Sequence, residues 1–277
     1  MHLTQLQKSA LETLCYVIGA AAFTVFIRWL QTQVAADDGG LYGDMVWNYL
    51  VPLFAIIAIF IFISMVNGYT KKRYILNEDL FCALKNDSKL YTAVSVVIGA
   101  VMAVGGLFLL ASCETDQQAL LLKILSVLGV LAGIAFPVLM RLYNNRTSNR
   151  SLMCVLATLP IILFAMWLIT TYKCNDISSI VWGFGVEIIG VSIALCSFYR
   201  MAGFVYDAPD MKRSLFFSMF GAFALIVTLA DERYMGMQLM LIGAICMLLY
   251  YCWVIISNLD RKEAPPSYQP IDGFERL

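Results

Sequence analysis

Glu187 is an acidic residue near the middle of a long apolar stretch, residues 177–199. It lies about ten residues into that stretch, roughly 15 Å along an α-helix. An ionised carboxylate is costly inside a lipid bilayer, and such residues commonly face the protein interior on the route of an ion or proton. We therefore predict that Glu187 binds a proton, an ion or a small solute. The alternative left open is a buried acid that is hydrogen-bonded to a neighbouring helix and has only a structural role.

Small residues share the predicted helix face of this acid. Gly183, Glu187, Gly190, Ala194 and Ser197 follow one another at alternating spacings of four and three residues. This spacing places them on one narrow face of a helix, and small side chains let a second helix approach closely. We expect Glu187 to point into a helical bundle, with Gly183 and Gly190 beside it in the candidate site.

Lys123 is a second charged residue within an apolar segment, and we include it in the candidate site. It shares a helix face with small residues and a proline, namely Ser126, Gly129, Gly133 and Pro137. That pattern is compatible with an inward orientation. The favoured interpretation is that its long side chain extends outward to the membrane surface.

Histidine chemistry is excluded from these apolar segments. His2, the single histidine, lies outside all of them. Metal-dependent hydrolysis, a histidine base, histidine-ligated haem and most zinc sites all need histidine. The chain also has no phosphate-binding loop or dinucleotide fingerprint. We predict no catalytic residues, no metal and no cofactor, and an enzymatic function is disfavoured.

The composition is that of a membrane protein. Hydrophobic residues make up 61% of the 277 positions and charged residues 14%, whereas soluble domains have roughly 45–50% and about 25%. A spanning helix needs about 20 mostly apolar residues. Eight segments meet this condition: 13–30, 46–66, 90–111, 119–140, 151–171, 177–199, 214–230 and 235–257. We predict an all-α, polytopic membrane protein. A cleaved signal peptide is the alternative for the first segment, although Arg28 near its end argues against it.

Loop charges predict the orientation. Lys and Arg collect in the loops on one side, and the loops on the other side carry mainly acids, such as Asp231 and Glu232. Because cytosolic loops retain basic residues, we place both termini in the cytosol and the protein in the plasma membrane. Four tryptophans fall near the predicted outer ends, where aromatic residues favour the headgroup level: Trp29, Trp47, Trp167 and Trp182. We also expect Arg28 to be an anchor at this outer interface.

The spans form four consecutive hairpins in a single domain, residues 1–259, followed by a flexible cytosolic tail, residues 260–277. Ser88, Ser151 and Ser214 are evenly spaced near the starts of three hairpins. Duplication would explain this spacing, and so would the constant thickness of the bilayer. The loop segment 67–89 contains a possible amphipathic helix with Leu76, Leu80, Phe81 and Leu84 on one side, which we expect to lie on the inner leaflet.

Two functions are favoured, and a lipid-modifying membrane enzyme is a weaker third. The first is a small transporter or permease-like subunit that handles a small solute or ion at Glu187. The second is a non-catalytic scaffold, accessory or signalling subunit that packs against a protein partner or a second copy of itself. Lys plus Arg equal Asp plus Glu at 19 each, so the net charge does not support nucleic-acid binding. A polar cavity that reaches Glu187 would favour transport, and tight packing with a long apolar groove would favour the scaffold.

Overall fold

The fold is known from a computed structural model. It describes residues 4–37, 45–71, 74–75, 80–85, 88–112, 119–145, 149–175 and 181–261. The long helices are α1 (Gln5–Asp37), α2 (Met45–Lys71), α4 (Lys89–Ser112), α5 (Ala119–Leu142), α6 (Arg150–Asn175), α7 (Val181–Ala202), α8 (Met211–Thr228) and α9 (Met235–Ser257). Within the described ranges, these eight helices are long and apolar enough to cross a membrane. The prediction of an all-helical, multi-pass membrane protein is confirmed to that extent.

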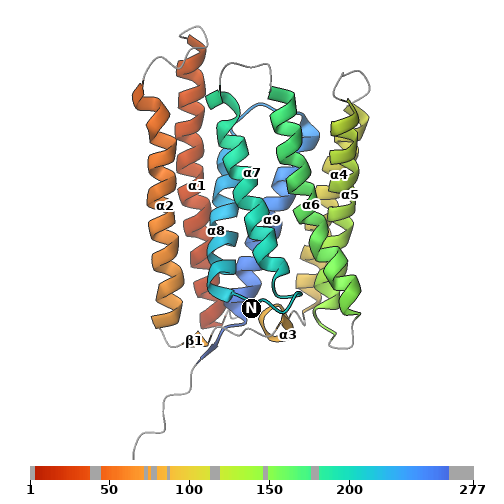
Figure 1. The fold of residues 1–277 in the computed structure, drawn as a ribbon. Helices are drawn as coiled ribbons and strands as arrows, with labels where there is room; N and C mark the ends of the chain where they lie inside the picture. Colours follow the sequence, from red (N-terminus) through yellow and green to blue (C-terminus); the bar gives the residue numbers. More distant parts are fainter. Residues whose placement is uncertain are drawn as a thin grey trace, which may run out of the picture.

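Helices α8 and α9 form the centre of the bundle. About two thirds or more of their spanning windows is buried, at 67% and 72%, against 22% for α2. Helix α9 packs against α1, α4 and α8, and α8 packs against α1, α2 and α7. In Figure 1, α2 stands at one edge, α4 and α5 stand at the other, and α8 and α9 lie between them. Helix α2 therefore presents large apolar side chains outward, such as Ile56 and Phe60, as a lipid environment requires.

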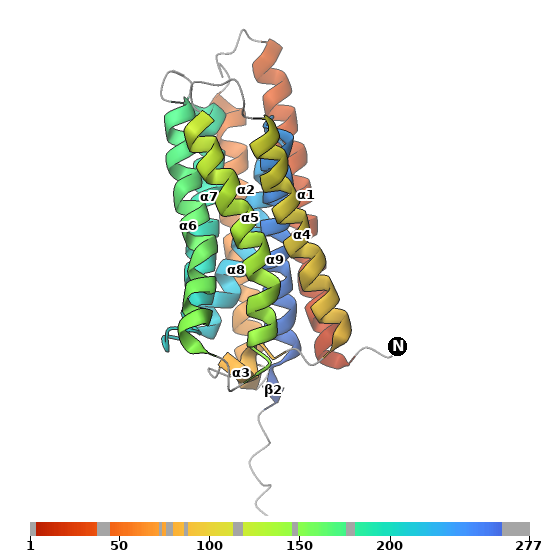
Figure 2. The ribbon, with the colours of Figure 1, turned by 90° about the vertical axis from the view of Figure 1, so that its right-hand side faces the viewer.

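Glycines bring α4 and α5 into close contact, and the two helices lie side by side in both views (Figure 2). A Cβ atom added at Gly99 would lie 2.8 Å from Cδ of Pro137 and would also collide with the carbonyl oxygen of Gly133. A Cβ at Gly133 would lie 2.6 Å from the carbonyl oxygen of Gly99. The two helices are therefore in close contact, as small residues allow.

A short helix, α3 (Leu80–Ala83), lies at the end of the bundle where α9 ends. Leu80 and Leu84 are buried, and the side-chain amide of Asn258 donates hydrogen bonds to the carbonyl oxygens of Ala83 (3.0 Å) and Lys85 (2.8 Å). Leu80 and Leu84 therefore pack on the protein, and the predicted position of this segment on the inner leaflet stays a prediction. Leu76 lies outside the described residues.

Two very short strands lie at the same end. Strand β1 (Tyr74–Ile75) pairs in antiparallel fashion with β2 (Asp260–Arg261), so that Tyr74 is opposite Arg261. This pairing joins the segment after α2 to the segment after α9. The predicted tail beyond Arg261 lies outside the described residues.

The contacts between helices do not distinguish the predicted arrangement in four hairpins from other arrangements, and they do not show the orientation in the membrane. Each predicted hairpin pair is in contact, but α5 with α6 and α4 with α9 are in contact too. Ser214 is buried and donates to the carbonyl oxygen of Arg200 (3.2 Å), whereas Ser88 and Ser151 are exposed. The chain enters α1 and leaves α9 at the same end of the bundle (Figure 1). Four repeated hairpins and cytosolic termini stay predictions.

Candidate functional site

Glu187 lies near one end of α7, which packs between α6 and α8. It is six residues after Val181, where α7 begins, which corresponds to about 9 Å of helix. The residue is 8% exposed, so it points into the bundle as predicted. The described part of α7 begins at Val181, so this distance is counted from there.

Three side chains hold the carboxylate of Glu187. Trp167 Nε1 donates a hydrogen bond to Oε1 (2.8 Å), and the Thr171 hydroxyl donates to the same oxygen (3.1 Å). Both donors are on α6, one turn apart. Arg233 Nε lies 3.1 Å from Oε2 as an ion pair. Within the described residues this Nε makes no hydrogen bond of suitable geometry, so the contact with Glu187 is mainly electrostatic.

The ion pair extends into a network of four charged side chains. Arg233 Nη2 lies 3.2 Å from Asp231 Oδ2, and Arg28 Nε lies 2.9 Å from Asp231 Oδ1. Arg28 Nη1 also donates to the Gln31 side-chain oxygen (2.9 Å). We call Arg28, Glu187, Asp231 and Arg233 the charge network. It joins α1, α7 and the segment between α8 and α9. Its two cations and two anions balance, as buried charges require.

The two arginine side chains are the most buried members of the charge network. The side chains of Arg28 and Arg233 are 1% and 5% exposed, and that of Asp231 is 12% exposed. Burial raises the pKa of Asp231 above its usual value, although Arg28 and Arg233 oppose this effect. Asp231 and Arg233 both lie in the segment between the spanning helices α8 and α9, and burial disfavours the charge of Asp231.

A polar cavity of about 510 Å³ adjoins the network. It is lined by Leu122, Thr170, Thr171, Cys174, Glu187, Glu232, Arg233, Tyr234 and Met237. Both members of the Glu187–Arg233 ion pair are among these residues, so the pair faces a space that a solute or water can occupy. We call this space the polar cavity.

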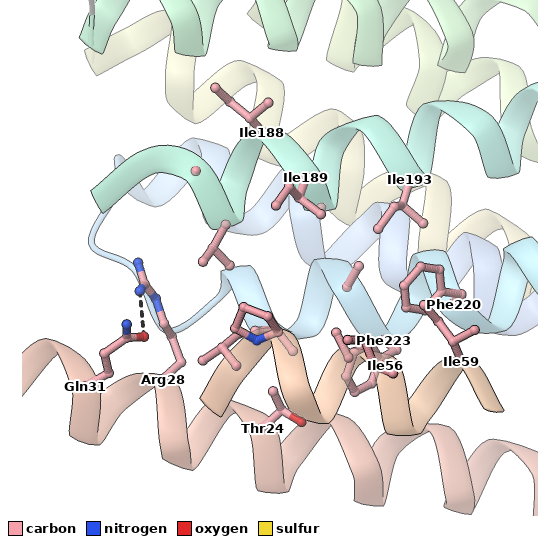
Figure 3. Close-up of a pocket in the computed structure, with 18 residues that line it drawn as sticks. Thr24, Arg28, Gln31, Ile56, Ile59, Ile188, Ile189, Ile193, Phe220 and Phe223 are labelled. Atoms are coloured by element: carbon pink, nitrogen blue, oxygen red, sulfur yellow. Dashed lines mark hydrogen bonds between the residues drawn. The ribbon is translucent and has the colours of Figure 1, made fainter. Parts of the chain in front are cut away.

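A larger and mostly apolar space lies on the other side of α7. It has a volume of about 720 Å³ and is bounded by α1, α2, α7 and α8. Isoleucines of α2 and α7 and phenylalanines of α8 form its walls, and Arg28 and Gln31 stand at one end (Figure 3). We call this space the lateral groove. The charge network therefore reaches both spaces, the groove through Arg28 and the polar cavity through Arg233 and Glu187.

The other predicted site residues have different positions. Gly190 lies beside Glu187 on the buried face and lines the lateral groove; a Cβ there would lie 2.6 Å from Cγ2 of Thr228. Gly183 belongs to the first turn of α7, where side-chain surroundings lie outside the described residues. Lys123 is exposed on α5, and α6 lies against both α5 and α7. The described structure therefore brings Gly190, but not Lys123, to Glu187.

Two residues that the sequence placed near the outer membrane interface have side chains that point into the bundle instead of outward. Arg28 is buried in the charge network. Trp167 is fully buried and stacks on Phe164, with the ring centroids 5.9 Å apart. For Arg28 a signal was present in the sequence, because it shares a helix face with Thr24 and Gln31, which are also buried.

The site combines two carboxylates and two guanidinium groups in mutual ion pairs. Among the described residues, no group of three or more His, Cys, Asp or Glu side chains is placed to hold a metal ion. Comparison of the chain with protein-family models, curated proteins and solved structures finds no match. The inference of function therefore rests on the two spaces and on the charge network that lies between them.

Proposed function

We propose that the protein is a small transporter or permease-like subunit in which a proton or small monovalent cation reaches Glu187 through the polar cavity. One observation carries the proposal: the polar cavity is lined by both Glu187 and Arg233. Intramembrane acids that border wet cavities commonly mark ion or proton routes. With both termini in the cytosol, as the loop charges predict, the cavity opens toward the outside of the plasma membrane.

The ion pair supplies a means of coupling. Arg233 occupies the place at Oε2 of Glu187 that an entering cation needs, and it can retain Asp231 as a partner when it is displaced. A proton or cation that binds Glu187 therefore breaks the tie between α7 and the segment before α9. A ligand shifts a conformational equilibrium by binding one state more tightly than another. Here the bound cation favours the state in which this tie is open.

A scaffold or accessory subunit is the second candidate, and the completeness of the network favours it. Each of the four charges has an opposite charge within 3.2 Å. A static tie between α1, α7 and the segment after α8 would have the same arrangement. Under this alternative the network only holds helices together, and the partner of the subunit binds elsewhere.

Ion flux into proteoliposomes distinguishes the two. We would impose gradients of H⁺, Na⁺ and K⁺ separately and record each flux with an indicator inside the vesicles. Transport predicts a flux of at least one of these ions above that of protein-free vesicles, and Glu187→Gln should lower it to that background. The control is Glu12→Gln, because Glu12 is exposed on α1. Wild-type protein without flux of any of the three ions, or full flux in Glu187→Gln, contradicts the proposal.

A further inference from the structure

The lateral groove opens sideways, toward the lipid. Helix α2 packs against α1 and α8, and α7 packs against α6 and α8, with no substantial packing between α2 and α7 in the described ranges. The face of α8 that carries Phe220 and Phe223 therefore forms the floor of the groove, and α2 and α7 form its rims (Figure 3). Ile56 on one rim and Ile189 on the other are 51% and 61% exposed. In a bilayer both rims contact hydrocarbon, so the groove is continuous with the lipid.

The chemistry of the groove changes along its length. It follows α7 from Gly185 to Ile193, which is roughly 12 Å of helix. Most of this length is lined by apolar side chains, and Arg28 and Gln31 stand at the end near the segment between α8 and α9 (Figure 3). An occupant that matches both parts has an extended apolar chain and a head that accepts hydrogen bonds. Guanidinium groups bind phosphate oxygens especially well.

We propose that the lateral groove is a binding site for one glycerophospholipid, with an acyl chain along the isoleucine and phenylalanine walls and the phosphodiester at Arg28 and Gln31. Water does not fill an apolar groove at hydrocarbon depth, and an empty groove would forfeit the contacts of its walls. A partner helix fits less well, since the groove follows only about 12 Å of α7, which is about two helical turns. Glu187 does not line this groove, although Arg28 also belongs to the charge network.

Gly185 allows the groove to be filled without disturbing the bundle. A Cβ atom added there meets nothing within 4 Å, and the same is true of Gly19, which is exposed on α1 outside the groove. Gly185→Leu therefore occupies the groove, and Gly19→Leu is its matched control. Each buried methylene contributes about fourfold to affinity, so displacing two or more of them predicts a loss of about tenfold or more for Gly185→Leu.

The experiment is native mass spectrometry of the purified full-length protein in detergent with added dioleoylphosphatidylglycerol. Wild type and Gly19→Leu should retain one phospholipid, and Gly185→Leu should lose it by about tenfold. Dioleoylglycerol, which has the same chains without a phosphodiester, tests the head: wild type should prefer the phospholipid, and Gln31→Leu should weaken that preference.

Several results would overturn the inference. They are full lipid retention in Gly185→Leu, equal retention of dioleoylglycerol and phospholipid by wild type, or a co-purified polypeptide that Gly185→Leu releases in place of lipid. Ion flux is measured on the same variants. Loss of flux in Glu187→Gln with lipid retained would separate the polar cavity from the groove.

Discussion

Arg28 on α1 and Asp231 after α8 are 203 positions apart in the sequence, and Arg28 Nε and Asp231 Oδ1 are 2.9 Å apart. This ion pair fixes the first helix to the segment that joins the two central helices. Helix α1 also packs on α8 and α9 along its length. The contact of α1 with the two central helices therefore combines apolar packing with the Arg28–Asp231 ion pair, and this ion pair lies at one end of α1.

Removing the Arg28 charge should destabilise the protein strongly. Arg28→Gln leaves Asp231 with Arg233 as its remaining cation among the described residues, in a place where burial already raises the Asp231 pKa. Breaking a buried ion pair by removing one partner costs about 3–5 kcal/mol. The thermal unfolding midpoint in detergent should fall well below that of Arg141→Gln, a control at an exposed arginine of α5. Equal midpoints for the two variants would refute the buried pairing.

The ring nitrogen of Trp167 should contribute to the stability of the protein, in addition to the contribution from the size of the ring. Trp167→Phe removes the donor to Glu187 and keeps a ring that can stack on Phe164. A hydrogen bond to a charged group contributes about 1.5–3 kcal/mol. We expect a lower unfolding midpoint than for Trp29→Phe, since Trp29 is 48% exposed. An unchanged midpoint would mean that the Trp167 nitrogen does not hold Glu187.

A larger side chain at the close contact between α4 and α5 should destabilise the protein. A Cβ at Gly99 meets backbone and ring atoms on α5, and neither can rotate away. Overpacking of this kind costs about 1–3 kcal/mol, so Gly99→Ala should lower both the folded yield and the unfolding midpoint. Gly19→Ala is the control, because a Cβ there meets nothing within 4 Å. The close contact is contradicted if both alanine variants behave as wild type.

The orientation can be measured by labelling single cysteines in a background from which the native cysteines have been removed. Glu232 is exposed between α8 and α9, and Ser88 is exposed just before α4. If both termini are cytosolic, a membrane-impermeant maleimide labels Glu232→Cys in intact cells and labels Ser88→Cys only after permeabilisation. The reverse pattern would show that the loop charges were misread.

The sequence predicts the spans well because hydropathy is a local property. The eight apolar segments correspond to the eight long helices, and the small residues near Glu187 correctly indicate its inward face. The charge network escaped prediction because it depends on how helices are rotated against one another. Trp167 and Arg28 have the depth of interface residues, but the rotation of α6 and α1 turns both inward. The side chain of Lys123 is exposed on α5, so this residue does not join the charge network.

The equality of positive and negative charge in the network has an electrical consequence. Moving one elementary charge across a membrane potential changes the free energy by about 2.3 kcal/mol per 100 mV. Two cations and two anions that move together give no such change, so the transmembrane voltage exerts no net force on the paired network. Binding of a proton or cation at Glu187 leaves one positive charge in excess. If the proposed transport function is correct, the voltage then acts on the cation-bound form alone.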